Sequence, residues 1–195
     1  MSALLLVAPG QPAEAGEPQE KVRQTVEAVV AVLADKSLPA QERRSRIRRV
    51  VLQRFGFEEM AQRSLAQHWR PLTPQQRQEF VTLFTDLLER SYVSRIESTS
   101  PEAHAIRYAK EEINNDQAAV YTEITSSDEP VSVAYRLLHR DGDWKVYDIV
   151  IEGVSLVNNY RTQFNTIIAK DAYAGLVKQM RLKREQENAV PAQQG

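Results

Sequence analysis

The sequence contains no cysteine among its 195 residues. Disulfides, iron–sulfur clusters, cysteine-ligated zinc and thiol catalysis are therefore excluded. Glycine is also scarce, with seven residues, and none of them forms a glycine-rich phosphate-binding loop. No apolar run approaches the roughly 18 residues that a membrane-spanning helix needs. Several classes of redox, nucleotide-binding and membrane-spanning protein are removed by these absences.

Histidine and net charge give no sign of a metal or a nucleic acid. The three histidines, His68, His104 and His139, are far apart and lack metal-ligand spacing, so we expect surface or edge positions. The net charge is −1, which gives the whole molecule no attraction to DNA or to an anionic membrane. Hydrophobic residues make up 42% and charged residues 26%, as in an ordinary globular domain. We expect no metal, no cofactor and no nucleic-acid partner.

The length suits one domain with short flanking segments. Residues 3–8 are apolar and Ala13-Glu14-Ala15 resembles a small-x-small cleavage site, but no Lys or Arg precedes the apolar run. We interpret residues 1–18 as the remnant of a signal peptide or as a disordered tail. Residues 19–185 are predicted to form a single domain, and residues 186–195 a frayed C-terminal tail.

Helical spacing of apolar residues dominates both ends of the chain. It predicts helices over residues 19–33, 40–55 and 58–69, a long one from Thr73 to about Pro101, and two more beginning near Leu156 and Ala172. The clearest start is Thr73-Pro74-Gln75-Gln76, where Thr73 and Gln76 can form a capping box.

Between these helices the apolar period changes to two. It predicts strands over residues 104–112, 117–125, 131–139 and 144–152, separated by short turns such as Asp141-Gly142-Asp143. Loops this short make consecutive strands antiparallel. The predicted fold class is therefore α+β, a four-stranded antiparallel sheet packed with about six helices.

Possible catalytic or binding groups are few. Asp148 and Glu152 share a face of the fourth predicted strand, either pairing with nearby basic residues or forming an acid–base pair in a cavity. Ser155 is read as a helix N-cap, because Val157 stands where a nucleophile elbow requires glycine. The most basic stretch is a helix face that is either solvated or docks on an acidic protein or a lipid head group. It comprises Arg43, Arg44, Arg46, Arg48, Arg49 and Arg54.

The stretch from Trp144 to Phe164, WKVYDIVIEGVSLVNNYRTQF, resembles the signature of the MlaC family. A looser resemblance extends from about Val22 to Leu182. It implies a periplasmic phospholipid-binding protein of the Mla pathway, a family also called toluene-tolerance proteins or ABC-transporter auxiliary components. The implied fold is NTF2-like, with a curved sheet and an apolar cavity, and the implied protein has no catalytic residues.

The resemblance further implies transient partners. These are an outer-membrane lipoprotein–porin complex and an inner-membrane ABC transporter with an MCE-domain subunit, and the carrier itself is expected to be a monomer. Such a protein maintains outer-membrane lipid asymmetry.

With this resemblance, the apolar faces of the predicted sheet and helices become candidate walls of a lipid cavity rather than a close-packed core. Arg44 and Arg48 are the candidates for contact with a partner or with the lipid head group. The candidate cavity-lining residues are Phe84, Leu87, Leu88, Tyr92, Val131, Val133, Tyr135, Leu137, Tyr147, Leu156, Tyr160 and Phe164.

Two alternatives remain open. An NTF2-like enzyme acting on a small apolar substrate would use Asp148 with Tyr147 or His139 as acid and base. An interaction module without a ligand would dock through its arginine-rich helix and would contain a solid core.

Overall fold

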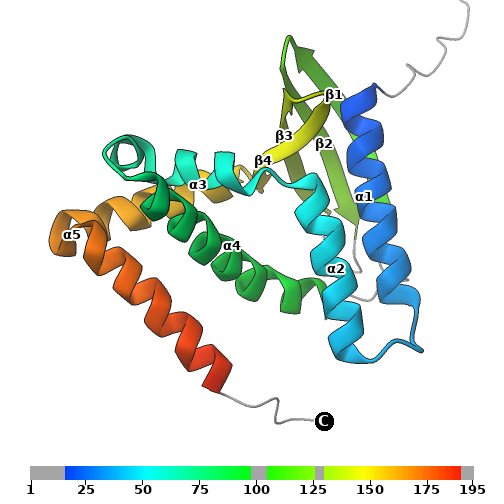
Figure 1. Ribbon diagram of the computed structural model, residues 1–195. Helices are drawn as coiled ribbons and strands as arrows, with labels where there is room; N and C mark the ends of the chain where they lie inside the picture. The colour runs from blue at the N-terminus through cyan, green and yellow to red at the C-terminus, as the bar shows by residue number, and fades with distance from the viewer. Residues whose placement is uncertain (1–15, 98–104, 126–129, 190–195) are drawn as a thin grey trace, which may run out of the picture.

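The computed structural model describes residues 16–97, 105–125 and 130–189 of the chain. Its sheet is an antiparallel meander in the order β1-β2-β3-β4-β5 (Figure 1). The strands are β1 (Ala105–Asn114), β2 (Gln117–Thr125), β3 (Val131–Arg140), β4 (Asp143–Ile151) and β5 (Val154–Ser155).

The helices precede and follow this sheet in the chain. They are α1 (Glu17–Ala34), α2 (Ala40–Arg54), α3 (Phe57–Leu65), the 3-10 helix η1 (Ala66–Trp69), α4 (Pro74–Glu97) and α5 (Leu156–Ala189). In Figure 1, α1 lies along the sheet and next to α2, whereas α3, α4 and α5 form a separate group. The predicted α+β class and the antiparallel order of the strands are confirmed.

The predicted number of strands is wrong, because β5 was missed. After β4 the chain reverses through Glu152 and Gly153, both at positive φ (48° and 78°), and Val154 returns to pair with Ile151. A two-residue strand is too short to show a period of two, so the sequence pattern could not reveal it. The turn also places Glu152 beyond β4, away from the strand face that it was predicted to share with Asp148.

The predicted helices are found, with differences at their ends. The capping box of α4 is confirmed: the Thr73 amide donates to Gln76 Oε1 at 2.9 Å, and the Gln76 amide donates to Thr73 Oγ1 at 3.2 Å. The helix predicted over residues 58–69 is divided into α3 and η1 at Ala66. The two predicted final helices are two parts of α5, which is interrupted at Ala172, with φ 55° and ψ 179°.

The start of α1 differs from the predicted boundary at residue 18. The helix begins at Glu17, and Pro18 is buried in its first turn, where a missing amide hydrogen costs nothing. The Glu111 carboxylate accepts hydrogen bonds from the amides of Gly16 (2.8 Å) and Gln19 (2.7 Å), so strand β1 caps this helix. Residues 1–15, which hold the predicted leader or tail, lie outside the described residues, as do His104 and Pro101. At the other end, α5 continues to Ala189, into the predicted frayed tail.

Two separate groups of buried side chains hold the fold together. The first lies among α3, η1, α4 and α5, and Phe80 and Phe84 are fully buried in it. The second lies between α1 and the sheet, and includes Val22, Val120 and Leu137. Phe55, at the end of α2, packs against both groups. The space between the two cores is where the candidate site is found.

Candidate functional site

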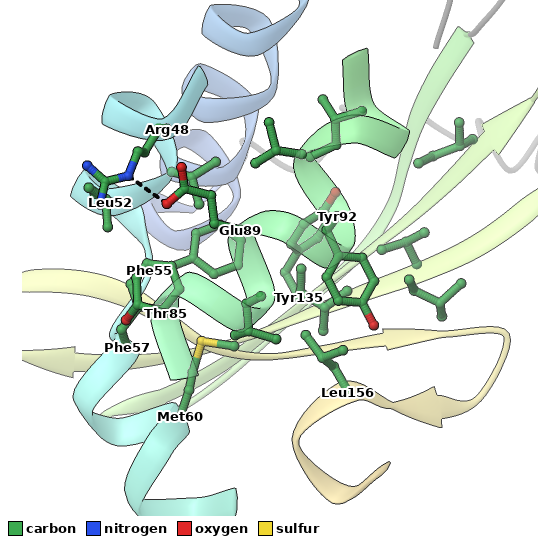
Figure 2. Close-up of a pocket in the computed structure, with 18 residues that line it drawn as sticks. Arg48, Leu52, Phe55, Phe57, Met60, Thr85, Glu89, Tyr92, Tyr135 and Leu156 are labelled. Atoms are coloured by element: carbon green, nitrogen blue, oxygen red, sulfur yellow. Dashed lines mark hydrogen bonds and ion pairs between the residues drawn. The ribbon is translucent and has the colours of Figure 1, made fainter. Parts of the chain in front are cut away.

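A cavity of about 380 Å³ lies between the sheet and helices α2, α3 and α4 (Figure 2). This volume falls within the roughly 300–1,000 Å³ that is usual for small-molecule sites. Most of the surrounding side chains are apolar. The lining residues are Arg48, Val51, Leu52, Phe55, Phe57, Met60, Thr85, Leu88, Glu89, Tyr92, Val93, Ile96, Ile124, Val133, Tyr135, Ile149, Ile151 and Leu156.

Helix α4 supplies one wall through a stripe of residues at helical spacing. Most of this stripe is turned away from the fully buried Phe80 and Phe84, which pack with α5; Leu88, one turn from Phe84, belongs both to the first core and to the cavity wall. Helix α4 therefore packs into a solid core along one side and lines the cavity along another. The residues of the cavity stripe are Thr85, Leu88, Glu89, Tyr92, Val93 and Ile96.

A bulge in β4 shapes the wall formed by the sheet. The pairing of β3 with β4 passes from Arg136↔Asp148 to Leu137↔Val146, which leaves Tyr147 as an extra residue. Because of this extra residue, Val146 and Ile149 both lie on the helix-covered side of the sheet, although they are three positions apart. Without the bulge, side chains three positions apart on a strand point to opposite faces.

The junction of α2 and α3 is fixed to the sheet beneath the cavity. The Gly56 amide donates to the Val146 carbonyl at 2.9 Å, and Phe55 forms a parallel bridge with Val146. The rings of Phe55 and Phe57 stack with centroids 6.0 Å apart. In Figure 2 these two rings and Met60 lie on one side of the cavity, with Tyr135 and Leu156 on the other.

Among the residues that line the cavity, only Arg48 and Glu89 are charged, and they lie next to each other. Arg48 Nε on α2 donates to Glu89 Oε2 on α4 at 2.6 Å, and this hydrogen bond raises the pKa of Arg48. The two side chains are 46% and 24% exposed, so the pair lies at the solvent edge of the cavity. Thr85 adds little polarity, because its hydroxyl donates to the Val81 carbonyl at 2.8 Å within α4.

The side chain of Tyr135 on β3 forms part of the cavity wall. Desolvation, supplemented by the nearby Tyr108, raises the pKa of Tyr135 to about 12, against the opposing effect of a hydrogen bond with Thr122. The Tyr135 side chain is therefore neutral at physiological pH. The wall formed by the sheet carries no charge among its lining residues.

The structure brings together some of the predicted cavity residues. Leu88 and Tyr92 on α4, Val133 and Tyr135 on β3, and Leu156 at the start of α5 all line the cavity. Their contact with a lipid stays a prediction. Arg48 also lines the cavity, whereas Arg44 lies outside it and pairs with Glu97 at 2.9 Å.

The remaining predicted cavity residues are placed elsewhere. Phe84, Tyr160 and Phe164 form a ring cluster with centroids 5.4–5.8 Å apart, inside the core between α4 and α5. Leu87 packs on the edge of the same core. Apolar side chains at helical spacing predict burial on this helix, but they do not distinguish a filled core from a cavity.

Three predicted residues of the sheet also lie outside the cavity. Leu137 is fully buried in the second core, beside Val120 and Val146. Tyr147, the bulge residue, lies under the Arg63 guanidinium at 4.2 Å from its ring centroid. Val131, at the beginning of β3, is 37% exposed.

Several lining residues were missed by the sequence reasoning. The signals that could have found some of them were present: the Phe55-Gly56-Phe57 junction, and the isoleucines that end the strands. The bulge that orients Ile149 leaves no mark in the sequence pattern. The missed residues are Val51, Leu52, Phe55, Phe57, Met60, Thr85, Glu89, Val93, Ile96, Ile124, Ile149 and Ile151.

Asp148 has a structural role. Its buried carboxylate accepts hydrogen bonds from Arg136 Nη1 (3.1 Å), from the Ser155 hydroxyl (2.7 Å) and from the Val157 amide (3.0 Å). Ser155 in turn accepts from the Asn158 amide at 3.0 Å, so its predicted role as an N-cap is confirmed. Neither Asp148 nor His139 lines the cavity; the His139 ring lies 5.0 Å from that of Trp144.

Within residues 16–97, 105–125 and 130–189, no three His, Asp or Glu side chains are grouped so that they could hold a metal ion. None of the helices in these ranges combines the length and hydropathy needed to span a membrane.

The fold and the cavity together define a class: an α+β protein in which a curved antiparallel sheet and helices enclose an apolar cavity with one ion pair at its edge. The MlaC protein family model matches residues 23–182, so the chain belongs to the MlaC family. A curated relative, the intermembrane phospholipid transport system binding protein MlaC of Haemophilus influenzae, is 23% identical over 147 residues, which cover 73% of this chain and 69% of that protein.

A solved structure supports the same assignment. The phospholipid-binding protein from Ralstonia solanacearum, solved in complex with a phospholipid, superposes with a TM-score of 0.78 at 26% sequence identity. The match covers 88% of this chain and 98% of that one.

Proposed function

We propose that this protein is a periplasmic carrier that binds phospholipids and shuttles them between an outer-membrane lipoprotein–porin complex and an inner-membrane ABC transporter with an MCE-domain subunit. The observation that supports the proposal is the apolar cavity between the two cores. The phospholipid bound by the Ralstonia solanacearum relative and the transport system named for the Haemophilus influenzae relative support the ligand and the process.

The chemistry of the wall suits acyl chains. A phospholipid exposes two chains of about fourteen methylenes, and at ~0.8 kcal/mol for each methylene their burial is worth roughly 22 kcal/mol. Aliphatic and aromatic side chains such as Leu88, Val133 and Phe55 offer this environment without competing polar groups. Acyl chains need no hydrogen bonds, and the wall offers few. We therefore propose that the chains enter the cavity while the head group stays at its solvent edge.

Native mass spectrometry of the purified protein, followed by organic extraction, tests the ligand class. We expect co-purified diacyl phospholipid, with one family of masses spaced by acyl-chain length. Protein that emerges from cells without lipid, and that takes up none from vesicles after delipidation, would overturn the proposal.

A matched pair of variants tests the location. Thr85 and Thr82 are both on α4, and both hydroxyls donate to the carbonyl four residues earlier, but only Thr85 lines the cavity. Thr85→Trp fills part of the cavity; displacing about three methylenes costs roughly 2.4 kcal/mol, or about fiftyfold in affinity. We expect Thr82→Trp, at an exposed position, to leave lipid binding unchanged. Equal lipid binding by the two variants would contradict this location.

A further inference from the structure

The ion pair at the edge of the cavity has a free side on each partner. Arg48 uses Nε to contact Glu89, and no other polar partner of its guanidinium is found among the described residues. Figure 2 shows the two Nη atoms of Arg48 directed away from Glu89. Glu89 uses Oε2 for this contact, so Oε1 also remains without a hydrogen bond there. One cationic and one anionic group are thus available side by side.

This pair makes one side of the cavity charged and leaves the other side apolar. Arg48 and Glu89 are the charged residues among those that line it, and they lie at the partly exposed edge formed by α2 and α4. The opposite wall consists of Val133, Tyr135 and Ile149 on the sheet, where no lining side chain is charged. At this edge, the polar end of an amphiphile whose chains occupy the apolar part lies next to the charged pair.

We propose that the Arg48–Glu89 pair makes the cavity selective for a zwitterionic head group, a phosphate ester that carries an ammonium group, over a purely anionic one. The phosphate accepts hydrogen bonds from the free Nη groups of Arg48, and the ammonium donates to Glu89. This inference rests on the proposed function and adds a head-group preference to it. An anionic head group such as phosphoglycerol gains the first contact but meets repulsion from Glu89, with no ammonium to offset it.

The expected preference is modest, because both side chains are partly exposed. Exposed ion pairs are worth up to about 1 kcal/mol, which corresponds to roughly two- to fivefold in relative affinity. Salt screens such pairs, so the preference should shrink as the ionic strength rises from about 0.01 M to about 1 M.

The chain provides its own control for this test. Arg44 and Glu97 also join α2 to α4, at 2.9 Å, but neither lines the cavity. Glu89→Gln removes the negative charge at the cavity edge and retains an oxygen that can accept from Arg48. Glu97→Gln makes the same change in the control pair. Circular dichroism and thermal melting establish that each variant is folded before it is loaded.

Competition for loading is the measurement. Delipidated protein is incubated with vesicles that contain equal amounts of phosphatidylethanolamine and phosphatidylglycerol with identical acyl chains, and the bound lipid is identified by native mass spectrometry. We expect the wild type and Glu97→Gln to favour phosphatidylethanolamine two- to fivefold, and Glu89→Gln to load the two lipids about equally. Equal loading of the wild type, or a preference that survives Glu89→Gln, overturns the selectivity and leaves the proposed carrier function intact. Failure to load either lipid overturns both.

Discussion

A leucine in the wall of the cavity should contribute less to stability than a leucine in a solid core. Leu88 and Leu137 allow the comparison, because both are buried, but Leu88 borders the cavity and Leu137 is enclosed between Val120 and Val146. We consider the substitutions Leu88→Ala and Leu137→Ala in delipidated protein, since bound ligand would itself raise stability.

The two costs can be worked out separately. Replacing leucine with alanine removes about three methylene equivalents, worth ~2.4 kcal/mol in transfer free energy. At Leu137 a new void of roughly 80 Å³ adds about 2 kcal/mol, at ~24 cal/mol for each Å³. Leu88 belongs to the first core but also borders the cavity, so its removed atoms leave little new void and most of this second contribution disappears. The free energy of unfolding should fall by about 4 kcal/mol for Leu137→Ala and about 2 kcal/mol for Leu88→Ala.

Chemical denaturation measures this difference, and unchanged m-values would show that the unfolding reaction is the same. In thermal unfolding the two variants should differ by roughly 4–8 °C, since 1 kcal/mol shifts Tm by about 2–4 °C in a chain of this size. Equal losses of stability would mean that Leu88 is packed on all sides. The cavity, and the carrier function proposed from it, would then have to be abandoned.

Two further predictions concern titration and backbone strain. Desolvation raises the pKa of Tyr135 to about 12, above its unfolded value of about 10. The contribution of the neutral Tyr135 side chain to the free energy of unfolding is therefore complete below pH 10 and is lost between pH 10 and 12. Denaturation at pH 8, 10 and 11.5 should show a decline in stability that is shallower for Tyr135→Phe; identical slopes would contradict the assignment. Ala172 adopts φ 55° and ψ 179°, a conformation that essentially only glycine tolerates, so Ala172→Gly should raise Tm by about 2–4 °C. Ala174→Gly, within the regular part of α5, should lower it by a similar amount, and a loss of stability in both variants would argue against strain at Ala172.

Local chemistry made much of the fold predictable. The capping box of Thr73 and Gln76 fixes the start of α4, and the Asp141-Gly142 turn between β3 and β4 has the positive φ angles expected of it. Each of these signals acts over a few residues and needs no tertiary partner. The cap of α1 is different, because Glu111 reaches it from β1, and nothing in the sequence near either residue indicates the contact.

The cavity was less predictable for a physical reason. Phe84 and Leu88 are one helical turn apart on α4, and both are apolar and buried, yet Phe84 packs against Tyr160 and Phe164 while Leu88 borders empty volume. Periodicity reports that a face is apolar. It does not report the distance to the next element, which here depends on the bulge at Tyr147 and on the bridge from Phe55 to Val146.

The arrangement of two cores around a cavity explains how such a protein remains folded when it is empty. A cavity lined by large apolar side chains lowers stability, because those side chains lack contacts on one side. Here the ring cluster of Phe84, Tyr160 and Phe164 and the buried sheet residues around Leu137 contain no residue that lines the cavity, although Met60 and Leu88 belong both to the first core and to the cavity wall. The lining side chains can therefore keep their contacts with the cores while they lack contacts on the side that faces the cavity, which an acyl chain would supply under the proposed function. Under the proposed function, occupancy adds the missing contacts and raises stability, and release removes only those contacts, so a lipid can enter and leave while both cores stay intact.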